Sequence, residues 1–200
     1  MTQNQAADDD LRVRRTRKLL QEALIELTVE KGYNTVTVSD ICERAMVNRS
    51  TFYRHYPGGK YDLLDKYMDY VQRFTARFVE EKLGQTGEGG PTGLINLLQH
   101  VQMFADFYRV MLGQMGDPVF TERFRQNAMN RYRFLLTNMG SEPAPNGPPI
   151  DLKLNYISCA AVGAILWWLE SGQPCTVEQL ATWISQLGIA SAGLFRPPGT

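Results

Sequence analysis

The sequence predicts an all-α protein, in which a three-helix N-terminal domain with a helix-turn-helix precedes a larger C-terminal helical domain. Apolar residues recur at spacings of three and four through most of the chain, as on one face of a helix. No stretch of strict alternation is long enough for a strand, and segments rich in Gly and Pro separate the helical runs. We expect a disordered tail at 1–10, the helix-turn-helix domain at 11–60 and the larger domain at 61–200.

The first predicted helix starts at Leu11 and ends at Gly32, a typical C-terminal stop after Lys31. One face of it is apolar, through Leu20, Ala23, Leu24 and Leu27. After a short connector, either Thr37 or Ser39 caps a brief helix. The three-residue turn 46–48 then leads to a second short helix, capped by Asn48 or Ser50.

Breakers divide the rest of the chain into further helices. Pro57-Gly58-Gly59 ends the second short helix, and a long amphipathic helix opens at Lys60. A linker at 84–93 and a loop at 140–149 are both rich in Gly and Pro. Between and after them we expect helices at about 92–105, 106–113, 118–139, 151–171 and 176–195.

Charge is segregated along a chain of 200 residues whose net charge is zero. Residues 11–60 hold ten Lys or Arg against five Asp or Glu, so this quarter carries +5 and the remainder −5. Such segregation indicates that the N-terminal quarter meets a polyanion. No signal peptide opens the chain, and the apolar run 158–170 is too short to span a bilayer, so we expect a cytoplasmic protein.

Enzyme chemistry finds little support in the sequence. The three cysteines have no metal-ligand spacing, and with only two histidines a zinc site is not expected. Neither histidine has a nucleophile or carboxylate neighbour in sequence, and there is no Gly-rich phosphate loop. We therefore expect no enzyme activity, no metal and no cofactor.

The stretch NRSTFYRHYPGGK, residues 48–60, combines positive charge with aromatic rings. Phe52 and Tyr56 lie four apart on the predicted helix and would pack inward, against Ile41 and Ala45. The rest of its circumference suits DNA, because Arg reads guanine edges while Ser, Thr, Tyr and His bind bases or phosphates. These candidates are Arg49, Ser50, Thr51, Tyr53, Arg54 and His55. The alternative is a solvated basic turn, although the basic segment RVRR at 12–15 could reach adjacent phosphates.

Residues 16–64 resemble the DNA-binding domain of TetR-family transcriptional repressors. The shared elements, in order, are a helix ending in EKGY, then TVTVSDICERA, then TFYRHY, then a Lys followed by DLL. The resemblance implies a dimeric, all-helical repressor whose recognition helix matches 49–55. It places Thr37, Thr51, Tyr53, His55 and Lys60 at positions that the family generally uses for DNA contacts.

Two departures from the family pattern affect this expectation. Met46 stands where the family usually has Gly, so the turn lacks a residue that adopts positive φ without cost. Three residues, Pro57 to Gly59, stand where the family normally has two before Lys60. The phosphate contact of Lys60 is therefore unsettled by sequence alone.

Large, soft side chains are concentrated in residues 92–139. Met and aromatic residues suit irregular apolar ligands, although the same residues form the core of any helical domain. The expected effector pocket consists of Phe104, Phe107, Tyr108, Met111, Met115, Phe124 and Tyr132. Gln102, Asp106, Arg109 and Arg123 are candidate polar anchors.

The last two predicted helices mix small and bulky apolar residues and are too apolar for both faces to meet solvent. A symmetric dimer with two helices from each subunit would bury them, and burial within one subunit is the alternative. The expected dimer interface consists of Ile157, Ala161, Ala164, Ile165, Trp168, Trp183, Leu187, Ala190 and Leu194.

The sequence thus favours a homodimeric regulator that binds double-stranded DNA at a palindromic operator. Its most favoured form is a repressor that a small hydrophobic effector releases. A regulator of the same fold without an effector, or an activator, is the alternative.

Overall fold

The computed structural model describes residues 2–86, 92–114, 116–138 and 147–190. Within these ranges the regular structure is helical and contains no strand, which confirms the predicted fold class. The helix-turn-helix region consists of α1 (Thr2–Lys31), the 3₁₀ turn η1 (Tyr33–Thr35), α2 (Val38–Arg44) and α3 (Arg49–His55). The remaining helices are α4 (Lys60–Thr86), α5 (Thr92–Met103), α6 (Ala105–Leu112), α7 (Pro118–Asn138), α8 (Ile150–Glu170) and α9 (Val177–Ile189).

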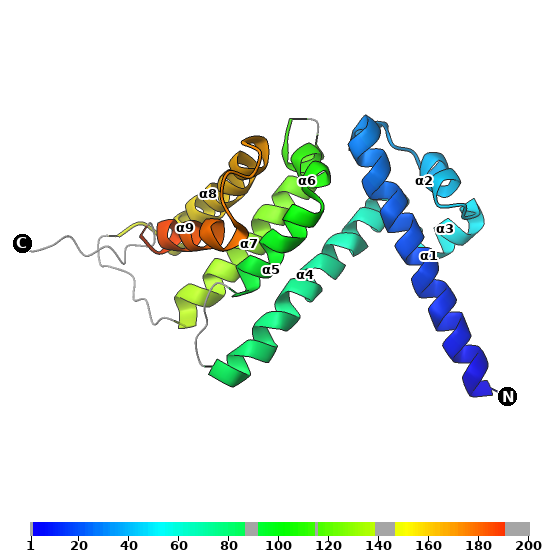
Figure 1. Ribbon diagram of the computed structural model, residues 1–200, viewed down its shortest axis with the longest axis horizontal. Coiled ribbons are helices and arrows are strands. Elements are labelled where there is room, and N and C mark those ends of the chain that lie inside the picture. Colours follow the sequence, from blue (N-terminus) through cyan, green and yellow to red (C-terminus); the bar gives the residue numbers. More distant parts are fainter. Residues whose placement is uncertain (1, 87–91, 115, 139–146, 191–200) are drawn as a thin grey trace, which may run out of the picture.

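The helices form two groups that α4 connects (Figure 1). The short helices α2 and α3 lie along one side of α1, and α5 to α9 pack at the other end of the molecule. Because α4 contacts both α1 and α5, it belongs to both groups. Buried residues from both groups join one continuous hydrophobic cluster, which includes Leu24, Leu63, Tyr67 and Phe107.

Residues 2–10 were expected to be disordered, and the structure instead continues α1 back to Thr2. The expectation rested on polarity and on the lack of an apolar period. Neither Gly nor Pro occurs between Met1 and Lys31, so nothing in the backbone chemistry interrupts a helix that the core nucleates downstream. The predicted end of this helix is confirmed, because Gly32 adopts a φ of 78° directly after Lys31.

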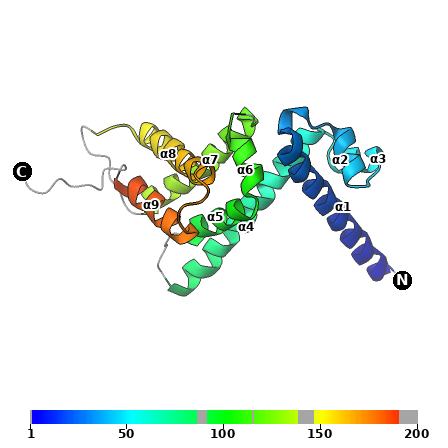
Figure 2. The same cartoon turned by 45° about the horizontal axis from the view of Figure 1, so that its top comes forward.

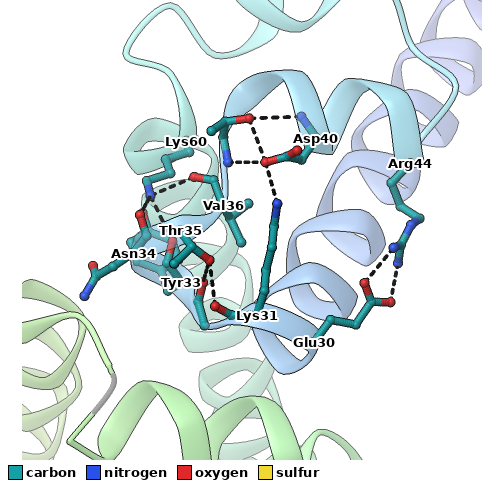
Figure 3. A network of polar contacts seen from close by, with 11 residues as sticks. Glu30, Lys31, Tyr33, Asn34, Thr35, Val36, Asp40, Arg44 and Lys60 are labelled. Atoms are coloured by element: carbon teal, nitrogen blue, oxygen red, sulfur yellow. Dashed lines mark hydrogen bonds and ion pairs between the residues drawn. The ribbon is translucent and has the colours of Figure 1, made fainter.

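Ion pairs fix α2 against the C-terminal end of α1 (Figure 3). Arg44 binds Glu30 through both terminal nitrogens at 2.7 Å, and one of them also reaches Glu26 at 3.0 Å. Lys31 lies 2.8 Å from the carboxylate of Asp40. These contacts orient α2, from which the turn leads into α3.

Among the described residues one helix, α8, has the length and composition of a membrane span, because its 21 residues extend beyond the apolar run 158–170. Its buried side alternates with an exposed side in this structure. Leu154, Ile157, Ile165 and Trp168 are at most 3% exposed, whereas Leu152 and Tyr156 are 60% and 64% exposed. This distribution is that of a core helix with one open face.

Met46 occupies the tight turn between α2 and α3 in a left-handed conformation, with φ of 54°. The side chain is 92% exposed, so it gains no burial that would offset the strain. A residue with a Cβ is disfavoured in this region of backbone space by about 1–2 kcal/mol. The absence of Gly at this position therefore costs stability, as the sequence indicated.

We expect Met46→Gly to raise the free energy of unfolding by about 1 kcal/mol, because it relieves the backbone strain at this turn. The gain is reduced because Gly loses more backbone entropy on folding than Met does. Urea denaturation followed by circular dichroism measures the change. Met46→Ala is the matched control, because it removes the exposed side chain and keeps the Cβ. If the Met46→Gly and Met46→Ala proteins unfold at the same urea concentration, the proposed backbone strain at Met46 is wrong.

Candidate nucleic-acid interface

The recognition helix α3 begins where the sequence predicted. Asn48 is its N-cap, and its side-chain oxygen accepts a hydrogen bond from the backbone N–H of Ser50 at 2.9 Å. The hydroxyl of Ser50 donates to the same oxygen at 3.0 Å. The turn itself closes through the N–H of Val47, which donates to the carbonyl of Cys42 at 2.9 Å. Local chemistry thus sets both the start and the direction of α3.

Two aromatic residues hold α3 on its scaffold, as predicted. Phe52 and Tyr56 are 0% and 1% exposed, and their ring centroids lie 5.5 Å apart. Ile41 and Ala45 of the preceding helix are also buried. With its inner face fixed in this way, α3 has no freedom to roll about its axis, so its outer side chains are presented in one orientation.

The outer face of α3 consists of Arg49, Ser50, Tyr53 and Arg54, all of which are exposed. These positions follow the i, i+1, i+4, i+5 spacing of one helix face. Thr51 and His55 are half-buried on its flanks. The six candidates from sequence therefore lie together, with four of them facing outward and two at the edge.

His55 lies in an electropositive environment. Burial lowers the pKa of this imidazole, and the nearby charges of Arg17, Arg54 and Lys66 lower it further. Arg17 comes from α1, so the positive surface extends from α3 onto the first helix. At neutral pH the ring is then mostly uncharged, and a phosphate beside it would favour its protonation.

Thr37, expected to contact DNA, is the N-cap of α2. Its hydroxyl donates to the carboxylate of Asp40 at 2.7 Å and accepts from the Asp40 N–H at 3.2 Å. The Thr37 N–H donates to the same carboxylate at 2.7 Å, which completes a capping box. The hydroxyl proton is already used, so the side chain has a structural role in this conformation.

Lys60 points toward the backbone of the 33–36 segment (Figure 3). Its ammonium donates to the carbonyls of Tyr33 and Val36, both at 2.9 Å, and to that of Asn34 at 3.3 Å. The same nitrogen lies 4.5 Å from the centroid of the Tyr33 ring. An ammonium has three donors, and all three are engaged. We therefore replace the expected phosphate contact of Lys60 with a structural role.

Lys66, on α4, supports α3 and was not singled out from the sequence. It donates to the carbonyl of His55 at 2.9 Å, so a cation lies at the C-terminal end of α3, where the helix dipole favours one. Its charge is also 3.2 Å from Asp62 and 5.1 Å from the Tyr56 ring centroid. The Asp62–Lys66 spacing of four was the only signal in the sequence.

Two family descriptions match the chain at positions that agree with these two groups of helices. Residues 20–67 match the family described as bacterial regulatory proteins, tetR family, and residues 91–188 match a transcriptional regulator C-terminal region. Together the two matches cover nearly three quarters of the chain. This chain belongs to the TetR family.

Similar proteins agree with the assignment. An uncharacterized helix-turn-helix transcriptional regulator of Bacillus subtilis, YxbF, is 39% identical over an alignment of 182 residues that covers 86% of this chain. The chain spans 44% of the length of that relative. A TetR transcriptional regulator from Streptococcus agalactiae is 25% identical with a TM-score of 0.64, over 92% of this chain and 98% of the other.

A further solved structure shares the fold. The TetR-family repressor FadR from Thermus thermophilus, in complex with lauroyl-CoA, is 18% identical with a TM-score of 0.54, over 92% of this chain and 98% of the other. The chain is therefore a TetR-family transcriptional regulator with a DNA-binding helix-turn-helix, and these similar proteins are regulators, not enzymes.

The effector pocket expected for a TetR-family protein is filled by its own side chains in this structure. Phe107, Tyr108, Met111 and Phe124 are at most 7% exposed. Phe120 joins them, with ring centroids 5.8 Å from Phe107, 6.0 Å from Tyr108 and 6.1 Å from Phe124. Phe104 and Tyr132, which were also expected in the pocket, are half-buried beside the core. Met115 lies outside the described ranges.

A buried histidine links this aromatic cluster to α4. The two ring nitrogens of His100 lie 3.4 Å from the Tyr67 hydroxyl and 3.1 Å from the Tyr108 hydroxyl. Burial lowers the pKa of His100 to about 4, so the ring is neutral at pH 7. A neutral imidazole donates from one nitrogen and accepts at the other, so one tyrosine donates to it and the other accepts.

Three of the four expected polar anchors form ion pairs. Arg123 of α7 forms ion pairs with Asp65 and Asp69 of α4, and Arg109 pairs with Asp106. Gln102 is exposed and borders a polar hollow of about 480 Å³ beside the N-terminus of α9. A second hollow, of about 310 Å³, lies where α4 meets the start of α7. Its lining includes Tyr61, Met68, Asp117, Val119 and Phe120.

The expected dimer interface is split by the structure. Ile157, Ala161, Ile165 and Trp168 face the core of their own subunit, at 0–7% exposed. The open face of α8 consists instead of Leu152, Tyr156, Cys159, Ala160, Gly163 and Trp167. On α9, Trp183, Leu187 and Ala190 are exposed as expected, and on α8 Ala164 is half-buried. Leu194 lies outside the described residues.

We expect Lys60→Met to lower the free energy of unfolding by about 2 kcal/mol, since it removes charge-assisted hydrogen bonds to three carbonyls. It should leave the salt dependence of DNA affinity unchanged, because the Lys60 ammonium does not reach a phosphate. Arg54→Met is the matched control on the outer face of α3. Arg54→Met should keep the free energy of unfolding within about 0.5 kcal/mol of the wild-type value. It should also flatten the plot of log DNA affinity against log salt concentration.

Denaturation and salt titrations of both variants test the role of Lys60. A Lys60→Met protein with wild-type stability and a flatter salt plot would return Lys60 to the set of phosphate-binding residues.

Proposed function

We propose that this chain is a dimeric, cytoplasmic transcriptional repressor that binds a palindromic operator and is released from it by a small hydrophobic effector. The outer face of α3 carries the proposal. Arg49 and Ser50 at its N-terminal end are proposed to contact bases, and Tyr53, Arg54 and His55 further along to bind phosphates. Buried anchors hold the opposite face of the helix, so this polar face has the rigidity that base recognition requires.

The open face of α8 supports the proposed dimer. Leu152, Tyr156 and Trp167 lie at helical spacing, and their side chains are 49–64% exposed. On α9, the apolar side chains of Trp183 and Leu187 are 45% and 65% exposed. Such a face on adjacent helices fits a second copy of itself in a four-helix arrangement. A two-fold dimer would present two α3 helices to half-sites related by the same symmetry.

Effector release is supported by how the aromatic cluster connects to the DNA-binding helices. Phe107 packs on Tyr67 of α4 with a centroid distance of 5.9 Å, and α6 also contacts α1. A ligand that enters between α6 and α7 must displace one of these rings. The displacement acts on α1 and α4, which support α2 and α3. Such a ligand need favour the unbound form by only about 1–3 kcal/mol to weaken operator binding.

A regulator of this fold without an effector is the second candidate, and the packing of the cluster favours it. The rings of Phe107, Tyr108, Phe120 and Phe124 contact one another directly and leave each side chain at most 7% exposed. The sign of regulation is also open in this second candidate, which includes an activator.

Selection from a random duplex pool with the full chain tests DNA binding. We expect enrichment of a two-fold symmetric sequence, whereas failure to enrich any sequence at moderate salt would defeat the proposal. Adding lauroyl-CoA, the ligand held by the Thermus thermophilus protein, and a panel of fatty acids to the enriched complex then separates the two candidates. Release by any of them supports the effector, and no release together with unchanged melting temperature supports the second candidate.

We expect Arg49→Ala to lose about 1–3 kcal/mol of discrimination at particular base pairs of the enriched sequence. Tyr53→Phe should instead weaken binding to all duplexes by a similar factor, because a phosphate contact carries no base preference. Fluorescence anisotropy with a set of single-base operator variants measures both. Equal behaviour of the two variants across that set would remove Arg49 from the base-reading residues.

We expect Trp167→Glu to shift the protein from dimer to monomer, because it replaces the largest apolar side chain of the open α8 face with a charge. Sedimentation velocity measures the change in mass. Met103→Glu is the matched control, as Met103 is 75% exposed at the end of α5 and lies off this face. A Trp167→Glu protein that stays dimeric at micromolar concentration would place the interface elsewhere.

A further inference from the structure

The N-terminal half of α1 leaves the hydrophobic core and extends past α2 and α3 (Figures 1 and 2). Among the side chains described along this helix, Leu20 is the first that is buried. Between Leu11 and Leu19, only Val13 and Thr16 are half-buried and the others are exposed. Core packing therefore accounts for α1 from Leu20 onward and gives no reason for the helix before it.

This exposed part of α1 is strongly basic. Arg12, Arg14, Arg15, Arg17 and Lys18 fill five of seven positions, and no acidic residue occurs between Leu11 and Gln21. At 100° per residue, the five side chains surround the sides of the helix that Val13 and Thr16 leave open. Lys18 is partly neutralised by Glu22 at 3.6 Å. The positive charge is thus concentrated upstream of the core.

The basic segment begins close to the C-terminal end of α3. Arg17 lies close enough to α3 for its charge to act on His55 and Tyr56. From there the helix rises 1.5 Å per residue, so Arg12 lies about 8 Å further along the axis. B-DNA has one phosphate per 3.4 Å of axis on each strand. This length of basic helix matches about two phosphates beyond those that α3 reaches.

The charge changes sign directly before this segment. Asp8, Asp9 and Asp10 follow one another in the sequence, immediately ahead of Leu11. At equal distance, each of these carboxylates repels a phosphate as strongly as one arginine attracts it. The sequence therefore limits the basic segment to residues 12–18.

We propose that residues 12–18 of α1 form a second DNA-binding element, which binds the phosphate backbone just outside the base pairs that α3 reads. The element carries no base preference and lengthens each half-site by about two to three base pairs. The three aspartates set its outer limit. This inference rests on the proposed function and extends it, since it assigns DNA contacts to a helix outside the helix-turn-helix.

The test uses the full chain and the duplex that the wild-type protein enriches, in one form trimmed to the symmetric core and one extended by several base pairs on each side. The variant is Arg12→Gln/Arg15→Gln. Its matched control, Arg133→Gln/Lys153→Gln, removes the same charge from α7 and α8. Both pairs are exposed or half-buried, and circular dichroism verifies that helix content is retained.

We expect wild-type protein and the control to bind the extended duplex about tenfold more tightly than the trimmed one, and the Arg12→Gln/Arg15→Gln protein to bind both alike. Its plot of log affinity against log salt should be flatter by about 0.9 for each phosphate that the variant no longer binds. Equal affinity of the wild-type protein for both duplexes, or equal salt slopes for the two double variants, would overturn the proposal.

Changing Asp8, Asp9 and Asp10 together to Asn tests the outer limit. We expect tighter binding to the extended duplex and no change with the trimmed one, and unchanged affinity for both would overturn the limit. These outcomes are separable from failure of the proposed function. If the proposed function fails, no duplex is enriched at all. If only the α1 element fails, Arg49→Ala still relaxes base preference, while the α1 variants have no effect on DNA affinity.

Discussion

The position of the DNA-binding face depends on one inward-facing ammonium group. Lys60 begins α4 and donates to three carbonyls of the 33–36 segment, which joins the end of α1 to the start of α2. A turn of this kind leaves backbone acceptors without helical partners, and a cation satisfies several at once. Three helices are thereby fixed at a single point. Lys66, one and a half turns later on α4, similarly holds the end of α3.

The sequence predicted this face well because its signals are local. A spacing of four identified Phe52 and Tyr56 as inward anchors, and side-chain chemistry narrowed the cap to Asn48 or Ser50, of which Asn48 is the N-cap. The sequence left the role of Lys60 unsettled, because its partners in this structure lie 24 to 27 residues away. These contacts arise from tertiary packing, whereas the DNA contact was implied by the family resemblance. Thr37 was ambiguous for a different reason, since a cap and a phosphate ligand use the same hydroxyl.

In the C-terminal helices, residue composition does not show which side chains form the core and which line a pocket or an interface. Met and aromatic residues between 92 and 139 fit a pocket and a core equally well, and the structure packs most of them as a core. Likewise α8 has two apolar faces. Trp167 and Trp168 are neighbours in sequence but lie on different faces of the helix, and their side chains are 49% and 0% exposed. The placement of α6, α7 and α9 decides which face is covered.

The uninterrupted length of α1 has a mechanical consequence. Its C-terminal end lies beside α6 in both views, and its other end extends freely past α3 (Figures 1 and 2). A helix of 30 residues is about 45 Å long. If it pivots near α6, a tilt of about 10° moves residues 12–18, roughly 24 Å from the pivot, by about 4 Å, which is more than the spacing between successive phosphates along one strand's axis. In the proposed complex the helix would therefore act as a lever, converting a small repacking at α6 into a loss of register on DNA.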